Sequence, residues 1–249
     1  MNIYLFDIET APSLGYYFDL WKEGNIVGTK ENWYILSFAI KELGTGKVQT
    51  FALPDFRGYK KNKEDDRLLV HKLWEFFDKA DILIAHNGDA FDIKKANARF
   101  IHHRLTPPSP YKTVDTLKLA RRHFKFDSNK LDALAQSLGL GAKLPHTGFN
   151  TWKGCMTGDM KAWAIMRKYN AHDVVLLEKV YNLLKAWGTH PNLNILTREN
   201  ACPKCQSKHW QKRGFKYTAT SEAQIYNCMG CGTYFTGKPE KLARRVYVR

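Results

Sequence analysis

The stretch Ile3-Tyr4-Leu5-Phe6-Asp7-Ile8-Glu9 decides the fold, because a strongly apolar run there suddenly carries two carboxylates. Side chains alternate across a β-strand, so Asp7 and Glu9 emerge on one face and continue the row of Ile3 and Leu5. The opposite row is also apolar, which predicts a central strand covered on both faces. Carboxylates about 7 Å or less apart in a poorly hydrated cleft repel each other, which favours a divalent cation between them. A strand end that simply runs into solvent is the alternative interpretation.

The charge of the chain indicates a polyanionic partner. The 249 residues include 39 Lys and Arg against 24 Asp and Glu, which gives a net charge of +15 and a pI near 9.5. This balance favours nucleic acid as the partner, the alternative being a basic protein that is merely soluble. The hydrophobic content of 44% is that of a globular chain, long enough for one α/β core and a small appendage.

Neither a membrane segment nor a targeting segment is expected. No apolar run approaches the ~18 residues of a membrane-spanning helix, and a core strand that starts near residue 2 leaves no room for a signal peptide. We therefore expect an intracellular, cytoplasmic protein. Its five cysteines should then be reduced or metal-bound.

The order of the predicted elements indicates a mixed α/β sheet. A hairpin meander followed by strands that alternate with helices predicts five strands, three antiparallel and then two parallel, flanked by helices. The predicted strands after the first are 34–41, 47–53, 82–85 and one near 113, and a long loop covers 11–32. The predicted helices are 64–78, one ending near 103, 131–138, 159–168 and 169–187, with a glycine-rich loop at 139–158.

Two further acidic positions can join the carboxylates of the first strand. Sites in such sheets form at strand ends, so Asp92, which follows the 82–85 strand, can lie beside them. Alone, Asp92 is equally explained as an acid in the first turn of a helix. Asp173 shares a helical face with Tyr169 next to apolar positions, and a buried acid there is costly without a partner. The joint occurrence of these acids favours one cleft.

Three segments resemble, in this order, the motifs of the DEDD 3′-5′ exonucleases, the family of proofreading domains in DNA polymerases. They are Phe6-Asp7-Ile8-Glu9-Thr10, Asn87-x-x-x-Phe91-Asp92 and Tyr169-x-x-x-Asp173. The second segment, like Lys130-Leu131-Asp132-Ala133-Leu134-Ala135, is similar to the family B polymerase version. The resemblance covers about residues 1–187 and implies a ribonuclease H-like fold. Lys168 stands where the histidine subclass has its histidine, so Tyr169 places the chain in the tyrosine subclass, DEDDy.

The resemblance implies hydrolysis of phosphodiester bonds with two Mg²⁺ or Mn²⁺ ions. Asp7 would bridge both ions, Glu9 and Asp173 would complete the first, and Asp92 would hold the second, largely through water. Tyr169 would orient the attacking water by its hydroxyl group. Carboxylates suit these hard cations, which prefer oxygen ligands. The resemblance also implies contacts to the substrate nucleotide from Thr10, Asn87 and Phe91.

The composition changes after Trp187, where residues 188–201 are typical of a linker. Two C-x-x-C pairs follow, separated by 22 residues. In an intracellular protein this pattern predicts one structural, tetrahedral Zn²⁺, with disulfides as the alternative; its ligands would be Cys202, Cys205, Cys228 and Cys231. We therefore expect an exonuclease domain at 1–187, a linker at 188–201, and a zinc ribbon with a basic tail at 202–249.

The C-terminal part carries more than half of the excess positive charge. Residues 188–249 hold 11 Lys and Arg against 3 Asp and Glu, a net charge of +8. The pattern is similar to zinc ribbons that bind nucleic acids and favours a module that grips phosphates, although a protein partner is an alternative. We expect its aromatic side chains to form the small core of the ribbon: Trp210, Phe215, Tyr217, Tyr226, Tyr234 and Phe235.

The sequence thus predicts a metal-dependent 3′-5′ exonuclease that acts on DNA with a free 3′ end and releases 5′-mononucleotides. One alternative is an RNA exonuclease or a structure-specific nuclease on the same scaffold. Another is a non-catalytic module that binds nucleic acid or protein.

Overall fold

The computed structural model describes the chain except for residues 19–25, 146–147, 189–192, 194–199 and 242–249. The chain divides into two compact units, residues 2–181 and residues 182–249 with Met1. Most of the predicted linker and most of the predicted basic tail lie outside the described residues. Each unit is described by itself below.

The described residues of the first unit contain seven strands, and its helices include the long helix α6, which ends just beyond residue 181. The elements in chain order are β1 (Ile3–Thr10), β2 (Leu14–Tyr16), β3 (Gly28–Glu31), β4 (Ile35–Glu42), β5 (Gln49–Ala52), the 3-10 helix η1 (Leu53–Asp55), α1 (Arg67–Lys79), β6 (Ile82–Ala85), α2 (Asp92–His102), β7 (Lys112–Asp115), α3 (Thr116–His123), α4 (Leu131–Ser137), α5 (Phe149–Thr157) and α6 (Met160–Leu184).

Five of these strands form one mixed sheet in the order β5-β4-β1-β6-β7. β4 pairs antiparallel with both β1 and β5, whereas β6 runs parallel to β1 and to β7. The predicted sheet of three antiparallel and two parallel strands is therefore confirmed. Its central strand is β1, as its doubly apolar pattern indicates.

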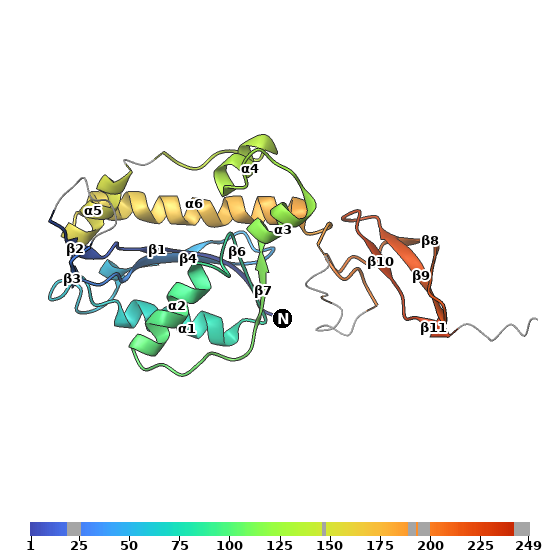
Figure 1. The fold of residues 1–249 in the computed structure, drawn as a ribbon, viewed down its shortest axis with the longest axis horizontal. Helices are drawn as coiled ribbons and strands as arrows, with labels where there is room; N and C mark the ends of the chain where they lie inside the picture. Colours follow the sequence, from blue (N-terminus) through green and yellow to red (C-terminus); the bar gives the residue numbers. More distant parts are fainter. Residues whose placement is uncertain (19–25, 146–147, 189–192, 194–199, 242–249) are drawn as a thin grey trace, which may run out of the picture. The chain divides into compact units, whose positions relative to one another are not determined.

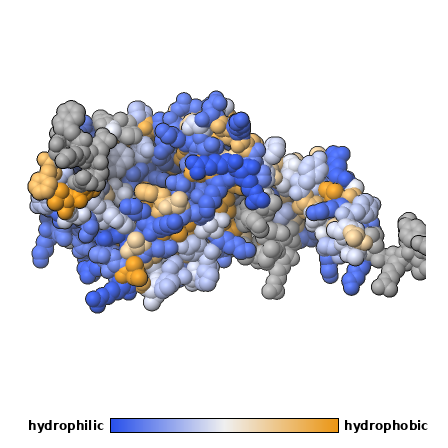
Figure 2. All heavy atoms as spheres, viewed as in Figure 1, coloured by the Kyte–Doolittle hydropathy of each residue, from blue (hydrophilic) through white to orange (hydrophobic). Residues whose placement is uncertain are grey.

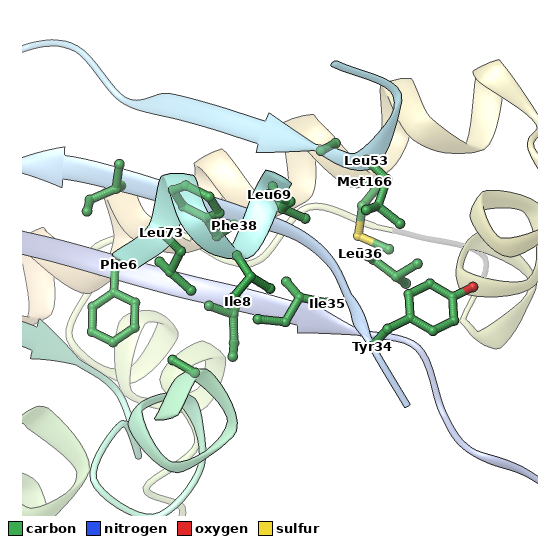
Figure 3. Close-up of a cluster of buried hydrophobic side chains, with 14 of the residues drawn as sticks. Phe6, Ile8, Tyr34, Ile35, Leu36, Phe38, Leu53, Leu69, Leu73 and Met166 are labelled. Atoms are coloured by element: carbon green, nitrogen blue, oxygen red, sulfur yellow. The ribbon is translucent and has the colours of Figure 1, made fainter. Parts of the chain in front are cut away.

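Both faces of β1 are covered by helices, because apolar side chains occupy both of its rows. Helices α1 and α2 lie on one face of the sheet and α6 runs along the other (Figure 1). Phe6 is fully buried, and its ring meets that of Phe77 from α1 edge to face, with centroids 5.1 Å apart. Leu69 and Leu73 of α1 extend this core (Figure 3). Burial of each such side chain contributes about 1.5–3 kcal/mol.

The second unit contains a small sheet around one central strand. Its strands are β8 (Trp210–Tyr217), β9 (Ser221–Cys228), β10 (Tyr234–Thr236) and β11 (Glu240–Lys241). β9 pairs antiparallel with all three others. The β8–β9 hairpin lies between the two C-x-x-C pairs, which agrees with the ribbon expected from their long separation.

The surface is mostly hydrophilic on the face drawn in Figure 2, with apolar side chains in small groups. Such groups are normal for a globular chain, since there is too little polar surface to cover it. No helix in the described part of the chain is both long enough and apolar enough to cross a membrane.

The structure corrects three predicted boundaries. The two helices predicted at 159–168 and 169–187 are one continuous helix, α6, because no Gly or Pro interrupts it. The predicted glycine-rich loop at 139–158 contains helix α5, whose ends are Gly148 and Gly158 with φ angles of +59° and +93°. These glycines flank a helix rather than fill a loop, and the left-handed Gly158 ends it, as glycines at helix C-termini commonly do. The predicted loop at 11–32 contains the polar hairpin β2–β3.

A buried ionic cluster fixes the start of α1 against α2. Asp66 is fully buried, and its carboxylate accepts hydrogen bonds from Arg99 Nε at 2.8 Å and from the backbone N–H of Ile35 at 2.9 Å. His103 Nε2 lies 2.6 Å from the other carboxylate oxygen. The carboxylate is therefore fully hydrogen-bonded, which is the condition under which a buried charge is tolerated.

Removal of this carboxylate should destabilise the fold strongly. In Asp66→Ala the guanidinium of Arg99 stays buried without its counter-charge, so we expect a loss of about 3–5 kcal/mol in the free energy of unfolding. Chemical denaturation followed by the helical circular dichroism signal measures it. As a control, Arg167→Met breaks the exposed pair with Asp55 and should cost about 1 kcal/mol or less. Equal losses in both variants would contradict the assigned role of Asp66.

Candidate active site

Three carboxylates from two distant segments meet at the end of β1. Asp7 and Glu9 lie on one face of this strand, and Asp173 projects from α6, which covers that face. One oxygen atom from each of the three can be chosen such that all lie within 4.8 Å of one another. Ligands on opposite sides of one Mg²⁺ are about 4.2 Å apart, so this donor set has the size and chemistry of a hard-cation site.

The carboxylates are electrostatically strained as a group. Burial, followed by the charges of Glu9, Asp92 and Asp173, raises the pKa of Asp7 well above its usual range. Burial and the charge of Asp173 likewise raise the pKa of Glu9 to about 8. In addition, Asp173 Oδ1 is buried and accepts no hydrogen bond. A cation would relieve the repulsion and give this oxygen a partner, so the residues present fit a divalent metal ion.

Asp92 lies at the edge of this group rather than in its centre. It starts helix α2 and is buried, and burial raises its pKa to about 7. Its Oδ1 accepts a hydrogen bond of 3.2 Å from the backbone N–H of Ile8, which ties the helix start to β1. Asp92 also raises the pKa of Asp7 and Glu9 through its charge, although it is not one of the three tightly grouped carboxylates. This position agrees with a ligand that acts largely through water.

Asn170 and Lys143, which the sequence patterns do not single out, touch the carboxylates directly. Asn170 is fully buried on α6, and its Nδ2 donates to Asp7 Oδ2 at 2.6 Å. Lys143 donates to Asp173 Oδ2 at 2.5 Å and to the Tyr169 hydroxyl at 2.9 Å. Asn170 stands three residues before Asp173 and so shares its helical face, which is a signal the sequence contains. Lys143 lies in the segment between α4 and α5, and no spacing rule connects it to the site.

Tyr169 is held beside the carboxylates by its neighbours. It is buried, and burial raises the pKa of its hydroxyl to about 12, so the hydroxyl keeps its proton at neutral pH. The ring of Trp152 from α5 packs edge to face against it, with centroids 6.0 Å apart. The Trp152 side chain also hydrogen-bonds Glu9. The glycine-rich pattern of residues 139–158 predicts a loop, so it does not point to Trp152, which α5 carries.

A cleft of about 440 Å³ opens next to Glu9. Thr10 lines it at the end of β1, where a bulge between Glu9 and Thr10 shifts the pairing with β4. Such bulges re-aim side chains next to sites. The other lining side chains include Trp33, Lys95, Phe149 and Trp152. The Lys95 ammonium lies 3.6 Å from the centre of the Trp33 ring, so the cleft combines aromatic surface with positive charge.

The other predicted nucleotide contacts occupy the turn between β6 and α2. Phe91 is 40% exposed, and its ring centre lies 5.7 Å from the Lys95 ammonium. Asn87 has a φ angle of +65°, and its backbone N–H donates to Asp115 at 2.9 Å. Asp115 also caps the start of α3. The Asp115 carboxylate thereby fixes the turn, and Phe91 lies next to Lys95, which lines the cleft.

The four predicted cysteine ligands lie together in the second unit. Their sulfur atoms are all within 4.8 Å of one another, with 3.7 Å between Cys202 and Cys231 and 3.6 Å between Cys205 and Cys228. Disulfides are excluded by these distances, since that bond is about 2.05 Å long. Tetrahedral Zn²⁺ with Zn–S bonds of about 2.3 Å places its sulfur ligands about 3.8 Å apart. The cluster therefore fits a zinc ribbon.

The pH dependence of stability should report the strained carboxylates. The pKa of Glu9 is raised from 4.5 to about 8, so the folded chain binds this proton more tightly than the unfolded chain does. That contribution is complete below about pH 4.5 and is lost as the pH rises toward 8. Without added Mg²⁺ or Mn²⁺, the free energy of unfolding should fall across this range, and Glu9→Gln should flatten the slope. Urea denaturation at several pH values measures it; identical slopes for both proteins would be contrary evidence.

Loss of one cysteine should release the zinc and unfold the second unit alone. Cys228→Ser removes one of four ligands, and so small a sheet depends on its metal for stability. We expect the bound zinc, measured by atomic absorption, to fall from one ion per chain toward zero. The control is Cys155→Ser in the first unit, which should keep the zinc. Full zinc occupancy in Cys228→Ser would show that the cluster is not the site.

Comparisons with known proteins give a family match and a structural likeness. A family model of the RNase H superfamily matches residues 17–185. Among solved structures, the chain is similar to the family B DNA polymerase from the hyperthermophilic archaeon Pyrobaculum calidifontis, with a TM-score of 0.49 and 16% identity. This likeness covers 74% of the present chain and 25% of the polymerase, so the chain spans about a quarter of that protein. A search of curated proteins finds no match.

The family match covers more than half of the chain and most of the sheet. It includes Asp92, Tyr169 and Asp173, whereas Asp7 and Glu9 precede its first residue. The mixed five-stranded sheet flanked by helices is an RNase H-like fold, and nucleases of this fold use divalent metal ions. The chain therefore belongs to the RNase H superfamily and carries its nuclease-type fold together with a four-cysteine module that fits a zinc ribbon.

Proposed function

We propose that the chain is a metal-dependent 3′-5′ exonuclease that hydrolyses phosphodiester bonds at DNA 3′ ends and releases 5′-mononucleotides. The observation that carries this proposal is the convergence of Asp7, Glu9 and Asp173 beside a cleft, with Asp92 at its edge. Carboxylates so close together in a partly buried site repel one another, and cations among them would offset this repulsion. Their position at the end of the central strand leaves one side open to substrate.

The four carboxylates divide the metal ligation between them. Asp7 would bridge two ions of Mg²⁺ or Mn²⁺, Glu9 and Asp173 would complete the first, and Asp92 would hold the second, largely through water. Two such ions, when bound, supply activation of the attacking water, neutralisation of the phosphate and stabilisation of the leaving 3′ oxygen. Asn170 keeps the Asp7 carboxylate in one orientation by its hydrogen bond.

Tyr169 and Lys143 would act together on the reacting groups. The Tyr169 hydroxyl retains its proton and receives a hydrogen bond from Lys143, so it is oriented to contact the attacking water. Burial lowers the pKa of Lys143, but its contacts with Asp173 and Tyr169 outweigh this and raise it, so the side chain stays charged. A fixed ammonium group here would add positive charge where the phosphate gains negative charge.

The cleft beside Glu9 would hold the terminal nucleotide. Trp33, Phe149 and Trp152 offer ring surface for a base, and Lys95 offers charge for a phosphate. Thr10 lies between this surface and the carboxylates. We propose Phe91 and Asn87, at the neighbouring turn, as further contacts to the substrate strand.

The proposed organisation assigns the nuclease to residues 1–187, a linker to 188–201, and a zinc ribbon with a basic tail to 202–249. The net charge of +8 in residues 188–249 supports a role of the ribbon in engaging the substrate. A protein partner of the ribbon is the alternative.

A nuclease assay with end-labelled oligonucleotides tests the proposal. With Mn²⁺, the native chain should shorten DNA stepwise from a free 3′ end, release mononucleotides, and leave a blocked 3′ end intact. Asp7→Ala should lower the rate at least about a thousandfold, because several kcal/mol of charge stabilisation are lost with the bridging ligand. The control is Asp89→Ala, whose carboxylate pairs with Lys118 outside the cluster and should not matter.

The same assay separates the alternatives. Cleavage of RNA but not DNA would assign an RNA exonuclease, and internal cleavage of end-blocked substrates a structure-specific nuclease. Binding without any release of mononucleotides would indicate a non-catalytic module. Cleavage by Asp7→Ala at the native rate would overturn the assignment of the carboxylate site.

A further inference from the structure

One face of the ribbon sheet gathers aromatic side chains that β-strand alternation alone would divide between both faces. The strand register determines which side chains share a face, because directly paired residues point the same way. Trp210 pairs with Cys228, Lys212 with Tyr226, and Phe235 with Tyr226 from the other side. Beyond them, Phe215 pairs with Gln224 and Tyr217 with Glu222. We call the resulting surface the aromatic face; its residues are Trp210, Lys212, Phe215, Tyr217, Tyr226 and Phe235.

A β-bulge in β8 creates this arrangement. The register shifts between Lys212 and Phe215, where Arg213 and Gly214 together oppose the single residue Ile225. Phe215 and Tyr217 follow Trp210 by an odd number of residues. Without the extra residue of the bulge, strand alternation would therefore place them on the face opposite Trp210. Gly214 has a φ angle of +89°, which glycine adopts at little cost, and its carbonyl accepts a hydrogen bond of 2.6 Å from the Gln224 side chain.

The five rings fall into two groups. Trp210, Tyr226 and Phe235 pack on one another, with ring centroids 4.6 to 6.4 Å apart, and they form the small core that the sequence predicts. Phe215 and Tyr217 are different, because they are 46% and 64% exposed. Their ring centroids lie 6.2 Å apart. The expectation that these two rings belong to the core is therefore wrong, and so is the same expectation for Tyr234, which is 65% exposed. Phe215 and Tyr217 are each a large apolar surface open to solvent next to the packed core.

One exposed cation, Lys212, shares the face with the exposed rings. Arg213 is exposed in the bulge, whereas the exposed Lys216 pairs with Ala223 and points to the opposite face. Between residues 202 and 241, seven Lys and Arg stand against two Glu. The two acids lie at one end of this face, because Glu222 pairs with Tyr217 and Glu240 pairs with Glu222. Exposed rings that share a face with Lys212, in a net positive module, complement a ligand that offers flat π surfaces and negative charge together.

We propose that the aromatic face binds single-stranded nucleic acid, with unpaired bases stacked on Phe215 and Tyr217 and a phosphate on Lys212. Unpaired bases expose their ring faces, whereas those in a duplex are stacked on one another, so this surface distinguishes single strands from duplexes. The inference rests on the proposed function only in naming nucleic acid as the ligand. It adds a binding surface outside the carboxylate site.

Fluorescence anisotropy with a labelled oligothymidylate tests this inference on the full, zinc-loaded chain. The measurement omits Mg²⁺ and Mn²⁺, so that no strand is cleaved, and uses no chelator, which would remove zinc. Phe215→Ala and Tyr217→Ala should each weaken binding about fivefold or more, since a stacked base typically contributes that much. Tyr217→Phe keeps the ring and should bind like the native chain. A duplex of the same length should be insensitive to all three changes.

The matched control is Tyr234→Ala. Tyr234 is 65% exposed, as much as Tyr217, but it precedes Phe235 and so points to the opposite face. Its loss should leave the affinity unchanged. Lys212→Ala should instead reduce the slope of log affinity against log salt concentration by roughly the amount that one phosphate contact contributes. The ring variants should leave this slope unchanged. Zinc content confirms that each variant is folded.

The inference would be overturned if Phe215→Ala and Tyr217→Ala, with zinc retained, bound the single strand as tightly as the native chain. It would also be overturned if Tyr234→Ala weakened binding to the same extent. Because no cleavage is measured, a failure of the proposed exonuclease leaves this test valid. An active nuclease with unchanged strand affinity in the ring variants would disprove only the role of the aromatic face.

Discussion

The mutual repulsion of the carboxylates gathered at the end of β1 is the constraint on which the structure depends. The central strand places Asp7 and Glu9 under helix α6, and the helix adds Asp173 to the same space. Each of the three has a raised pKa, so the folded chain holds them close at a cost. Groups with such perturbed pKa values are typical of functional sites, where a bound cation would offset their repulsion. The packing of the sheet is in this way connected to the chemistry at its edge.

The neighbouring residues compensate the repulsion only in part. Lys143 contributes one positive charge, and Asn170 contributes one hydrogen bond to Asp7. Neither contact reaches Asp173 Oδ1, which remains buried without a hydrogen bond. Because Lys143 bonds both Asp173 and Tyr169, it also fixes the tyrosine relative to the carboxylates. The chain thus pre-arranges the group, and the negative charge that remains makes this donor set fit a divalent ion.

Periodic patterns predicted the sheet and the acids, whereas contacts between distant segments could not be predicted. The apolar rows of β1 and the helical spacing of Tyr169 and Asp173 are local properties, and so is the C-x-x-C spacing. The sequence does not indicate Trp152, because the glycines on both sides of α5 predict a loop there. Lys143 lies in the segment between α4 and α5, where no periodic sequence pattern connects it to the site. The bulge at Gly214 shifts the register by one residue, so alternation alone does not predict that Phe215 and Tyr217 share a face with Trp210.

The most direct test of the account is anomalous X-ray diffraction from crystals of the full chain grown with Mn²⁺ and an oligonucleotide. The account predicts manganese peaks between Asp7, Glu9 and Asp173, a second one toward Asp92, and a zinc peak among the four cysteines. It predicts that Asp173→Asn loses the manganese peaks and keeps the zinc peak. Crystals that show zinc alone, with the native carboxylates pointing at no metal ion, would contradict the central claim.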